Sequence, residues 1–123
     1  MTRSTSGVLI CDDAPFMRRM IADILRGAGY PIVGEARDGV EAVEQYQALR
    51  PEIVTMDIVM PRLGGIDAVR EIVRVDPDAR IVMCSAMGHQ EVIDAALEAG
   101  ARDFVVKPFQ ASSVLEAVHR VLH

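Results

Sequence analysis

Cysteine, tryptophan and long apolar runs are scarce in this sequence, and each shortage excludes a class of protein. The 123 residues include two cysteines and no tryptophan. Cys11 and Cys84 lie near the ends of separate apolar runs, which predicts buried free thiols in a reducing cytoplasm and no redox chemistry. No apolar stretch approaches the ~20 residues that cross a bilayer. Residues 1–7 are too polar for a signal peptide, and we expect a disordered tail over residues 1–6.

The sequence also lacks a basic excess and the common phosphate and zinc motifs. Its formal net charge of -5 at pH 7 argues against a nucleic-acid partner, because such binding needs a concentrated basic face. It contains neither a GxGxxG nor a Walker sequence, the glycine-rich loops that bind nucleotide phosphates. His89, His119 and His123 fit no metal-ligand spacing, so we expect them on the surface.

Four short apolar runs are present, and each ends in a reactive polar residue. They are residues 8–11 before Asp12 and Asp13, 53–56 before Asp57, 81–84 before Ser85, and 104–106 before Lys107. Such runs, rich in valine and isoleucine and separated by helical patterns, are typical of buried parallel strands. The C-terminal ends of parallel strands share one edge of a sheet. We therefore expect three carboxylates, a hydroxyl and an ammonium group at one site.

Segments with helical spacing separate these runs and complete five β-α units. The first begins near Pro15, which is tolerated in a first helical turn, and its predicted apolar face is Phe16, Met17, Met20, Ile21, Ile24 and Leu25. A weak edge strand is expected over residues 32–34. This alternation predicts an α/β fold, doubly wound, with right-handed crossovers and helices on both faces of a parallel sheet.

Three further features locate the later helices. Asp38 and Glu41 have the spacing of a capping box, which starts the second helix. Leu97 belongs to the predicted apolar face of the fourth helix. Ser113 and Glu116 are spaced as a cap for the last helix.

Each polar residue at the strand ends has a structural explanation when taken singly. Asp12 or Asp13 is placed to cap a helix, Asp57 precedes a turn, and Ser85 and Lys107 fit a turn and a solvated charge. Their joint placement favours a functional site, because neighbouring carboxylates repel one another unless positive charge lies between them. Lys107 supplies one charge, and Mg²⁺ suits an oxygen-rich site that receives phosphate. Asp57 is then the best candidate nucleophile for forming an aspartyl phosphate.

These residues and their neighbours resemble the signature of response-regulator receiver domains. The matching motifs are Asp12-Asp13, residues 55–61, Gly65, residues 84–86 and Lys107-Pro108. The resemblance covers residues 8–122 and is strongest to single-domain chemotaxis regulators of the CheY type. It implies a receiver domain over residues 7–123 with a flavodoxin-like, CheY-like (βα)5 fold, whose parallel five-stranded sheet has the order 2-1-3-4-5. In that order Cys11 and Cys84 lie roughly 10 Å apart, beyond disulfide reach.

The resemblance also implies a role for each acidic residue. Asp57 would accept a phosphoryl group from a histidine kinase. Asp13, Asp57 and the backbone carbonyl of Val59 would bind Mg²⁺ directly, and Asp12 would act largely through water. Val59 and Met87 flank the acceptor, and neither apolar side chain can orient an attacking water. We therefore expect slow self-dephosphorylation.

The remaining residues of the motif are implied to hold the phosphate and transmit the signal. Lys107, before a cis peptide to Pro108, would pair with the phosphoryl oxygens, and Ser85 would hydrogen-bond one of them. Phe104 occupies the aromatic switch position that moves inward when Ser85 is drawn toward the phosphate. Ser85 stands where threonine is commoner and keeps its hydroxyl. Phe104 stands where tyrosine is frequent, so this switch would work by packing alone.

In the family, the face formed by the fourth helix, fifth strand and fifth helix binds partners. Here it corresponds to roughly residues 89–120, with Gly88, Gln90, Glu91 and Arg102 as polar rim residues. The implied partners are a CheA-like sensor histidine kinase, an output protein such as the flagellar motor switch, and a phosphatase. The resemblance implies a cytoplasmic monomer that binds neither nucleic acid nor membrane and is not an enzyme beyond its own phosphoryl transfer and dephosphorylation.

Other functions fit part of the pattern. The chain could be the receiver of a longer regulator with a transcriptional or enzymatic output, or a phosphate sink for another regulator. A phosphatase of the haloacid-dehalogenase type would use an Asp-x-Asp loop and a cap domain, whereas Asp12 and Asp13 are adjacent here. A flavodoxin-like cofactor binder is disfavoured, because an acidic pocket repels a flavin phosphate.

Overall fold

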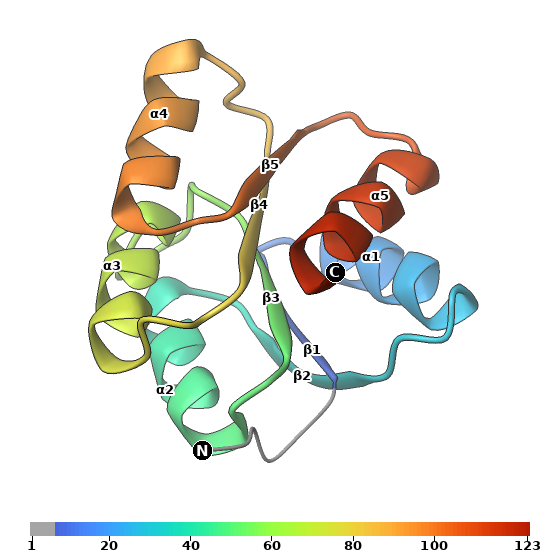
Figure 1. Cartoon of the computed structure of the whole chain (residues 1–123), viewed down its shortest axis with the longest axis horizontal. Helices are drawn as coiled ribbons and strands as arrows, with labels where there is room; N and C mark the ends of the chain where they lie inside the picture. The colour runs from blue at the N-terminus through green and yellow to red at the C-terminus, as the bar shows by residue number, and fades with distance from the viewer. Residues whose placement is uncertain (1–6) are drawn as a thin grey trace.

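Five parallel strands form the centre of the computed structural model, which describes residues 7–123 (Figure 1). They lie in the order β2-β1-β3-β4-β5, so the predicted fold and strand order are confirmed. The elements alternate along the chain as β1 (Val8–Cys11), α1 (Pro15–Gly27), β2 (Ile32–Ala36), α2 (Gly39–Leu49), β3 (Ile53–Met56), α3 (Gly65–Val75), β4 (Ile81–Ser85), α4 (Gln90–Ala99), β5 (Asp103–Val106) and α5 (Ala111–Leu122). The disordered tail predicted over residues 1–6 lies outside the described residues.

Helices cover both faces of the sheet and enclose two separate apolar cores. Helices α1 and α5 pack on one face, and α2, α3 and α4 pack on the other (Figure 1). Because strand side chains alternate between faces, Leu9 and Val54 belong to the core under α2, α3 and α4, whereas Ile10 and Val82 belong to the core under α1 and α5. Burial of these side chains is the dominant favourable term in folding.

The two cysteines are divided between these cores. Cys11 lies in the core under α2, α3 and α4, and Cys84 lies in the core under α1 and α5. Both are buried and free, as predicted. Burial raises the pKa of the Cys84 thiol to about 12 and also raises that of Cys11. Both thiols are therefore protonated at neutral pH and unreactive.

The register of the strands aligns the residues that follow them. Cys11 lies opposite Met56, Met56 lies opposite Met83, and Cys84 lies opposite Val105. The polar residues at the ends of β1, β3, β4 and β5 consequently come to the same edge of the sheet. This edge is where ligands bind in open parallel sheets.

The capping box predicted at the start of α2 is confirmed only in part. Asp38 caps the helix, because its Oδ1 accepts a hydrogen bond from the Glu41 N–H at 2.8 Å. The Glu41 carboxylate, however, accepts from the N–H of Arg37 at 3.0 Å. The reciprocal bond of the capping box is thus displaced by one residue toward the N-terminus.

Two expected boundaries are wrong. The predicted cap at Ser113 fails because α5 begins earlier, at Ala111, and the Ser113 N–H already bonds to the Gln110 carbonyl at 3.0 Å inside the first turn. No side-chain hydrogen bond caps this helix. The edge strand β2 also continues past the predicted residues 32–34 to Ala36, because its pairing with β1 extends to the end of that strand.

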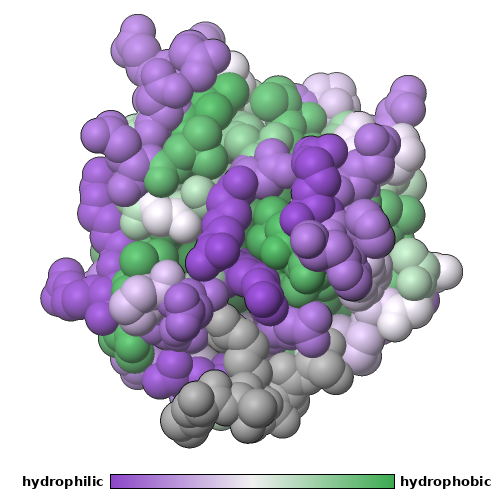
Figure 2. Space-filling view, viewed as in Figure 1, coloured by the Kyte–Doolittle hydropathy of each residue, from purple (hydrophilic) through white to green (hydrophobic). Residues whose placement is uncertain are grey.

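The surface carries three apolar side chains that were expected inside. Phe16 is 71 % exposed, Leu97 is 43 % exposed, and Val106, at the end of the edge strand β5, is 42 % exposed. Phe16 lies in the first turn of α1, where the next residue, Met17, is the one that packs against the core under α1 and α5. On the face shown in Figure 2, hydrophobic patches are separated by hydrophilic side chains. No helix within residues 7–123 has the length and apolar character that a membrane crossing requires.

Candidate functional site

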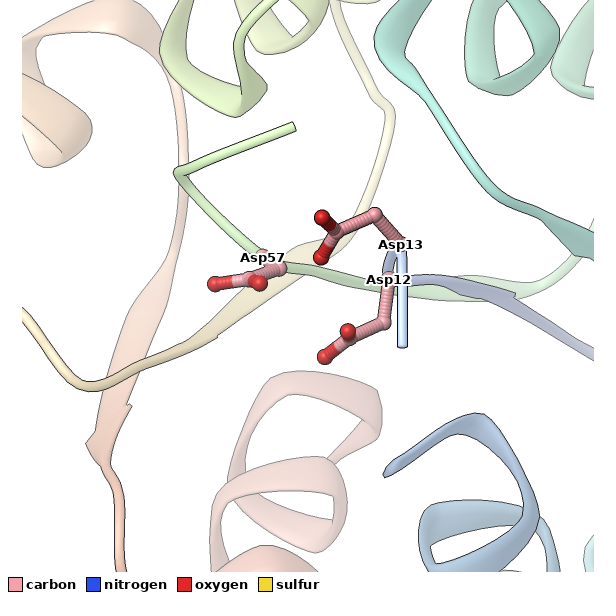
Figure 3. Close-up of side chains that lie close together, drawn as sticks. All are labelled: Asp12, Asp13 and Asp57. Carbon is pink, nitrogen blue, oxygen red and sulfur yellow. The ribbon is translucent and has the colours of Figure 1, made fainter. Parts of the chain in front are cut away.

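Three carboxylates gather at the C-terminal edge of the sheet. Asp12 and Asp13 follow β1, and Asp57 follows β3 (Figure 3). One oxygen from each of the three lies within 4.8 Å of the others. Asp12 and Asp57 are buried, whereas Asp13 is exposed. The structure thus places these three predicted residues together.

Lys107 supplies the positive charge nearest to this cluster. Its Nζ donates to Asp12 Oδ2 at 2.7 Å and lies 3.5 Å from Asp57 Oδ2. Burial lowers the pKa of Lys107, but the hydrogen bond to Asp12 and the charge of Asp57 outweigh burial, so the pKa is raised. The peptide between Lys107 and Pro108 is cis, as the resemblance implied. One charged ammonium group therefore faces three carboxylates.

Asp57 lies in a pocket that disfavours its ionised form. The side chain is almost fully buried, and its Oδ1 accepts a hydrogen bond from the Ile58 N–H at 2.8 Å. Burial and the charge of Asp12 raise the pKa of Asp57, although Lys107, the Ile58 N–H and the Ser85 hydroxyl act in the opposite direction. A further cation beside Asp57 would lower this pKa and favour the carboxylate.

Ser85 and Phe104 lie on the neighbouring strands β4 and β5, two positions apart in the register, because Ser85 pairs with Val106. Ser85 ends β4 and is buried, and its Oγ accepts a hydrogen bond from the Met87 N–H at 3.3 Å. Phe104 lies on β5 opposite Met83 and is partly buried against the core under α2, α3 and α4. Phe104 and Met83 pack on the same face of the sheet, and Ser85 follows Met83 by two residues, so its side chain lies on that face as well.

The loop between β3 and α3 passes close to Asp57. Val59 lies in this loop, and its side chain is 61 % exposed. The Gly65 N–H bonds to the Ile58 carbonyl at 2.7 Å. A Cβ at Gly65 would collide with the carbonyl oxygen of Asp57, so glycine is required where α3 begins this near the strand.

The four predicted partner-surface residues do not form one group. Gly88, Gln90 and Glu91 are exposed at the C-terminal edge of the sheet, before and within the first turn of α4. Arg102 is also exposed, but its N–H bonds to the Ile81 carbonyl at 2.8 Å, at the start of β4 and β5. Arg102 thus lies at the opposite edge of the sheet from the other three.

The donor set of the acidic cluster fits a hard divalent cation. Asp12, Asp13 and Asp57 offer only oxygen atoms, and no His or Cys joins them among residues 7–123. Oxygen-only sites with one or two direct carboxylates suit Mg²⁺, which keeps several water ligands. The exposure of Asp13 leaves room for that water. The residues present therefore fit Mg²⁺.

Two arginines near the site were missed by the reading of the sequence. Arg18 Nη1 donates to the Asp12 carbonyl at 2.7 Å. Arg62, with φ 66, donates from Nε and Nη2 to the two carboxylate oxygens of Asp38 at 3.0 and 3.2 Å. No sequence pattern distinguishes either arginine. Arg18 is followed by a second arginine, Arg19, and nothing in the sequence tells the two apart. Arg62 lies in a loop and matches no known motif.

Comparisons with known proteins agree with this geometry. A family model described as the response regulator receiver domain matches residues 8–119. The chain is 58 % identical over 114 residues to chemotaxis protein CheY of Thermotoga maritima, with 93 % of this chain and 95 % of that protein covered. It is 54 % identical over 116 residues to chemotaxis protein CheY of Bacillus subtilis, with 94 % and 97 % covered.

A solved structure shows a similar arrangement of the backbone. A chain in the crystal structure of the CheX-CheY-BeF3-Mg²⁺ complex from Borrelia burgdorferi superposes with a TM-score of 0.93 and 37 % sequence identity. The match covers 96 % of this chain and 90 % of that chain.

The raised pKa of Asp57 predicts that its carboxylate destabilises the fold when no cation is bound. The folded state holds the Asp57 proton more tightly than the unfolded chain, so stability falls as pH rises from the ordinary value of 3.8 through the raised folded pKa. At neutral pH with a chelator, Asp57→Asn should raise the free energy of unfolding by about 1 kcal/mol. This gain in the free energy of unfolding should be smaller at acidic pH. Urea denaturation at neutral and at acidic pH measures the two values.

The matched control is Asp23→Asn, which removes an exposed carboxylate on α1. It should leave the free energy of unfolding within about 0.5 kcal/mol of wild type. If the Asp57→Asn variant is less stable than wild type at neutral pH, the ionised Asp57 carboxylate is not in a repulsive environment and the prediction is wrong.

Proposed function

The chain belongs to the response regulator receiver domain family, and on this premise we propose that it is a phosphorylation-activated signalling switch of a two-component system. The observation that carries the proposal is the placement of Asp57 beside Asp12, Asp13 and Lys107 at one sheet edge. Asp57 receives the phosphoryl group of a histidine kinase. The new mixed anhydride forms at a carboxylate oxygen of Asp57 as the phosphorus–nitrogen bond of the phosphohistidine breaks.

Positioning and charge neutralisation supply most of the catalysis in such a transfer. Asp13, Asp57 and the Val59 carbonyl would hold Mg²⁺, with Asp12 acting through water. When bound there, the cation would supply positive charge against the phosphoryl oxygens. The raised pKa of Lys107 keeps its ammonium group charged. This group moves away from Asp12 and pairs with the phosphoryl oxygens. The Ser85 hydroxyl donates a hydrogen bond to one of the same oxygens.

The signal leaves the site through Ser85 and Phe104. A phosphoryl group adds charge and strong acceptors, but it changes a distant surface only by favouring one state of a two-state element. Ser85, residues 86–90 and Phe104 form this element. Phe104 also lines a surface hollow with Val106 of β5, Phe109 of the loop after β5, and residues of α5, so inward movement of its ring changes the shape of the α4-β5-α5 face.

Chemotaxis is the proposed setting, and it rests on the similarity to CheY proteins. The phosphodonor is a CheA-like sensor kinase, the output protein is the flagellar motor switch, and a phosphatase ends the signal. The domain occupies residues 7–123 and acts as a cytoplasmic monomer. Gly88, Gln90 and Glu91 lie on the partner surface, and Arg102 belongs to its distant end.

The proposal is tested by intact mass after incubation with acetyl phosphate and magnesium. We expect a single added phosphoryl group on wild type, since small phosphodonors need only the acceptor site and the cation. The adduct should be absent with a chelator and absent from Asp57→Asn. A folded wild-type protein without any adduct would contradict the proposed chemistry, and an adduct that survives in Asp57→Asn would contradict the choice of acceptor.

The exposed apolar residues beside Asp57 predict a long-lived phosphoryl group. Val59 and Met87 are 61 % and 37 % exposed and carry no group that can orient a hydrolytic water. Val59→Asn introduces an amide there and should speed dephosphorylation about tenfold, less than a full general base supplies. Phosphate release after removal of acetyl phosphate measures the rate.

Val75→Asn is the matched control, because it makes the same change at an exposed valine at the end of α3. Its dephosphorylation rate should equal that of wild type. An unchanged rate in Val59→Asn would mean that access of water, and not its orientation, limits hydrolysis.

A further inference from the structure

Arg18 links the acidic pair after β1 to the neighbouring strand β2. Its Nη1 donates to the Asp12 carbonyl at 2.7 Å, and its Nε donates to Glu35 Oε1 at 2.9 Å. The Arg18 side chain is 16 % exposed, and that of Glu35 is 47 % exposed. A guanidinium group is planar and rigid, so these two bonds fix its position from opposite sides.

The carbonyl that Arg18 holds belongs to the peptide unit between Asp12 and Asp13. Because a peptide unit is planar, a fixed carbonyl also fixes the N–H of Asp13 and the direction in which the chain enters that residue. Asp12 has other anchors, since its N–H bonds to the Ala36 carbonyl at 3.0 Å and its carboxylate bonds to Lys107. The exposed side chain of Asp13 has no hydrogen bond or ion pair to any residue within 7–123.

We propose that Arg18, held by Glu35, is a positioning residue for the magnesium ligand Asp13. This inference rests on the proposed function, in which Asp13 binds the cation directly. Arg18 does not contact the cation and acts through the peptide plane. Glu35 also offsets the charge of Arg18, which reduces the repulsion between the guanidinium group and a divalent cation.

The sign of the change in magnesium affinity separates positioning from charge. Removing a positive charge near an acidic site tightens binding of a divalent cation if only electrostatics matters. Releasing the peptide unit that carries Asp13 weakens binding, because a ligand that must be ordered on binding loses affinity. For a substitution of Arg18 by an uncharged residue, the two effects have opposite signs.

Calorimetric titration with magnesium alone compares wild type, Arg18→Met and Arg19→Met. We expect Arg18→Met to bind about tenfold more weakly, the scale on which loss of a residue that orients a metal ligand acts. Arg19→Met removes an exposed charge from the same turn of α1 and should bind as tightly as wild type or more tightly. An Arg18→Met protein that binds as tightly as wild type, or more tightly, overturns the proposal.

Two further measurements exclude a general loosening of the fold. With acetyl phosphate, the magnesium concentration that gives half the maximal phosphorylation rate should rise about tenfold in Arg18→Met, whereas the rate at saturating magnesium should stay near that of wild type. Arg18→Lys keeps one donor and should recover part of the affinity. A loss of the saturating rate together with affinity would indicate a disordered site and reject the specific role of Arg18.

Failure of this inference differs from failure of the proposed function. If wild type binds magnesium and is phosphorylated but Arg18→Met titrates like wild type, only the role of Arg18 is rejected. If wild type does neither, the proposed function itself is rejected.

Discussion

Repulsion among three carboxylates at one end of a buried sheet is the constraint on which the site depends. Oxygens of Asp12, Asp13 and Asp57 lie within 4.8 Å of one another, and Lys107 offsets one of the three charges. Burial, and then the charge of Asp12, raises the pKa of Asp57. The remaining excess of negative charge favours a divalent cation. Because a phosphoryl group brings further negative charge, the proposed phosphorylation of Asp57 requires that cation.

The fold holds these charges together by backbone geometry. Parallel register brings the ends of β1, β3 and β4 to one edge. Side chains two residues apart on a strand point to the same face of the sheet. Asp12 follows Ile10 by two residues and Lys107 follows Val105 by two, so both point to the face covered by α1 and α5, where Lys107 meets Asp12. The same alternation directs Asp57 to that face. Burial of the two cores provides the free energy that keeps like charges adjacent, since ordinary surface loops would let them separate.

Much of this arrangement could be predicted from local sequence signals, and the rest depends on long-range contacts. Strand ends, the sheet order and the acidic cluster follow from apolar runs, their polar termini and a family resemblance. The exposure of Phe16, the start of α5 before Ser113 and the bond from Arg18 to the Asp12 carbonyl do not follow. Each depends on where a helix lies relative to the sheet, and one sequence does not encode that position in any short pattern.

A crystal structure with magnesium and beryllium fluoride, a phosphoryl mimic, tests the central claim most directly. We expect the cation between Asp13 and Asp57, the fluoride on an Asp57 oxygen, and Lys107 Nζ moved from Asp12 to a fluorine atom. Ser85 Oγ should approach a second fluorine, and Phe104 should be more buried. A fully soaked crystal with Lys107 still on Asp12 and no ligand at Asp57 would contradict the claim that this acidic cluster is a phosphorylation site.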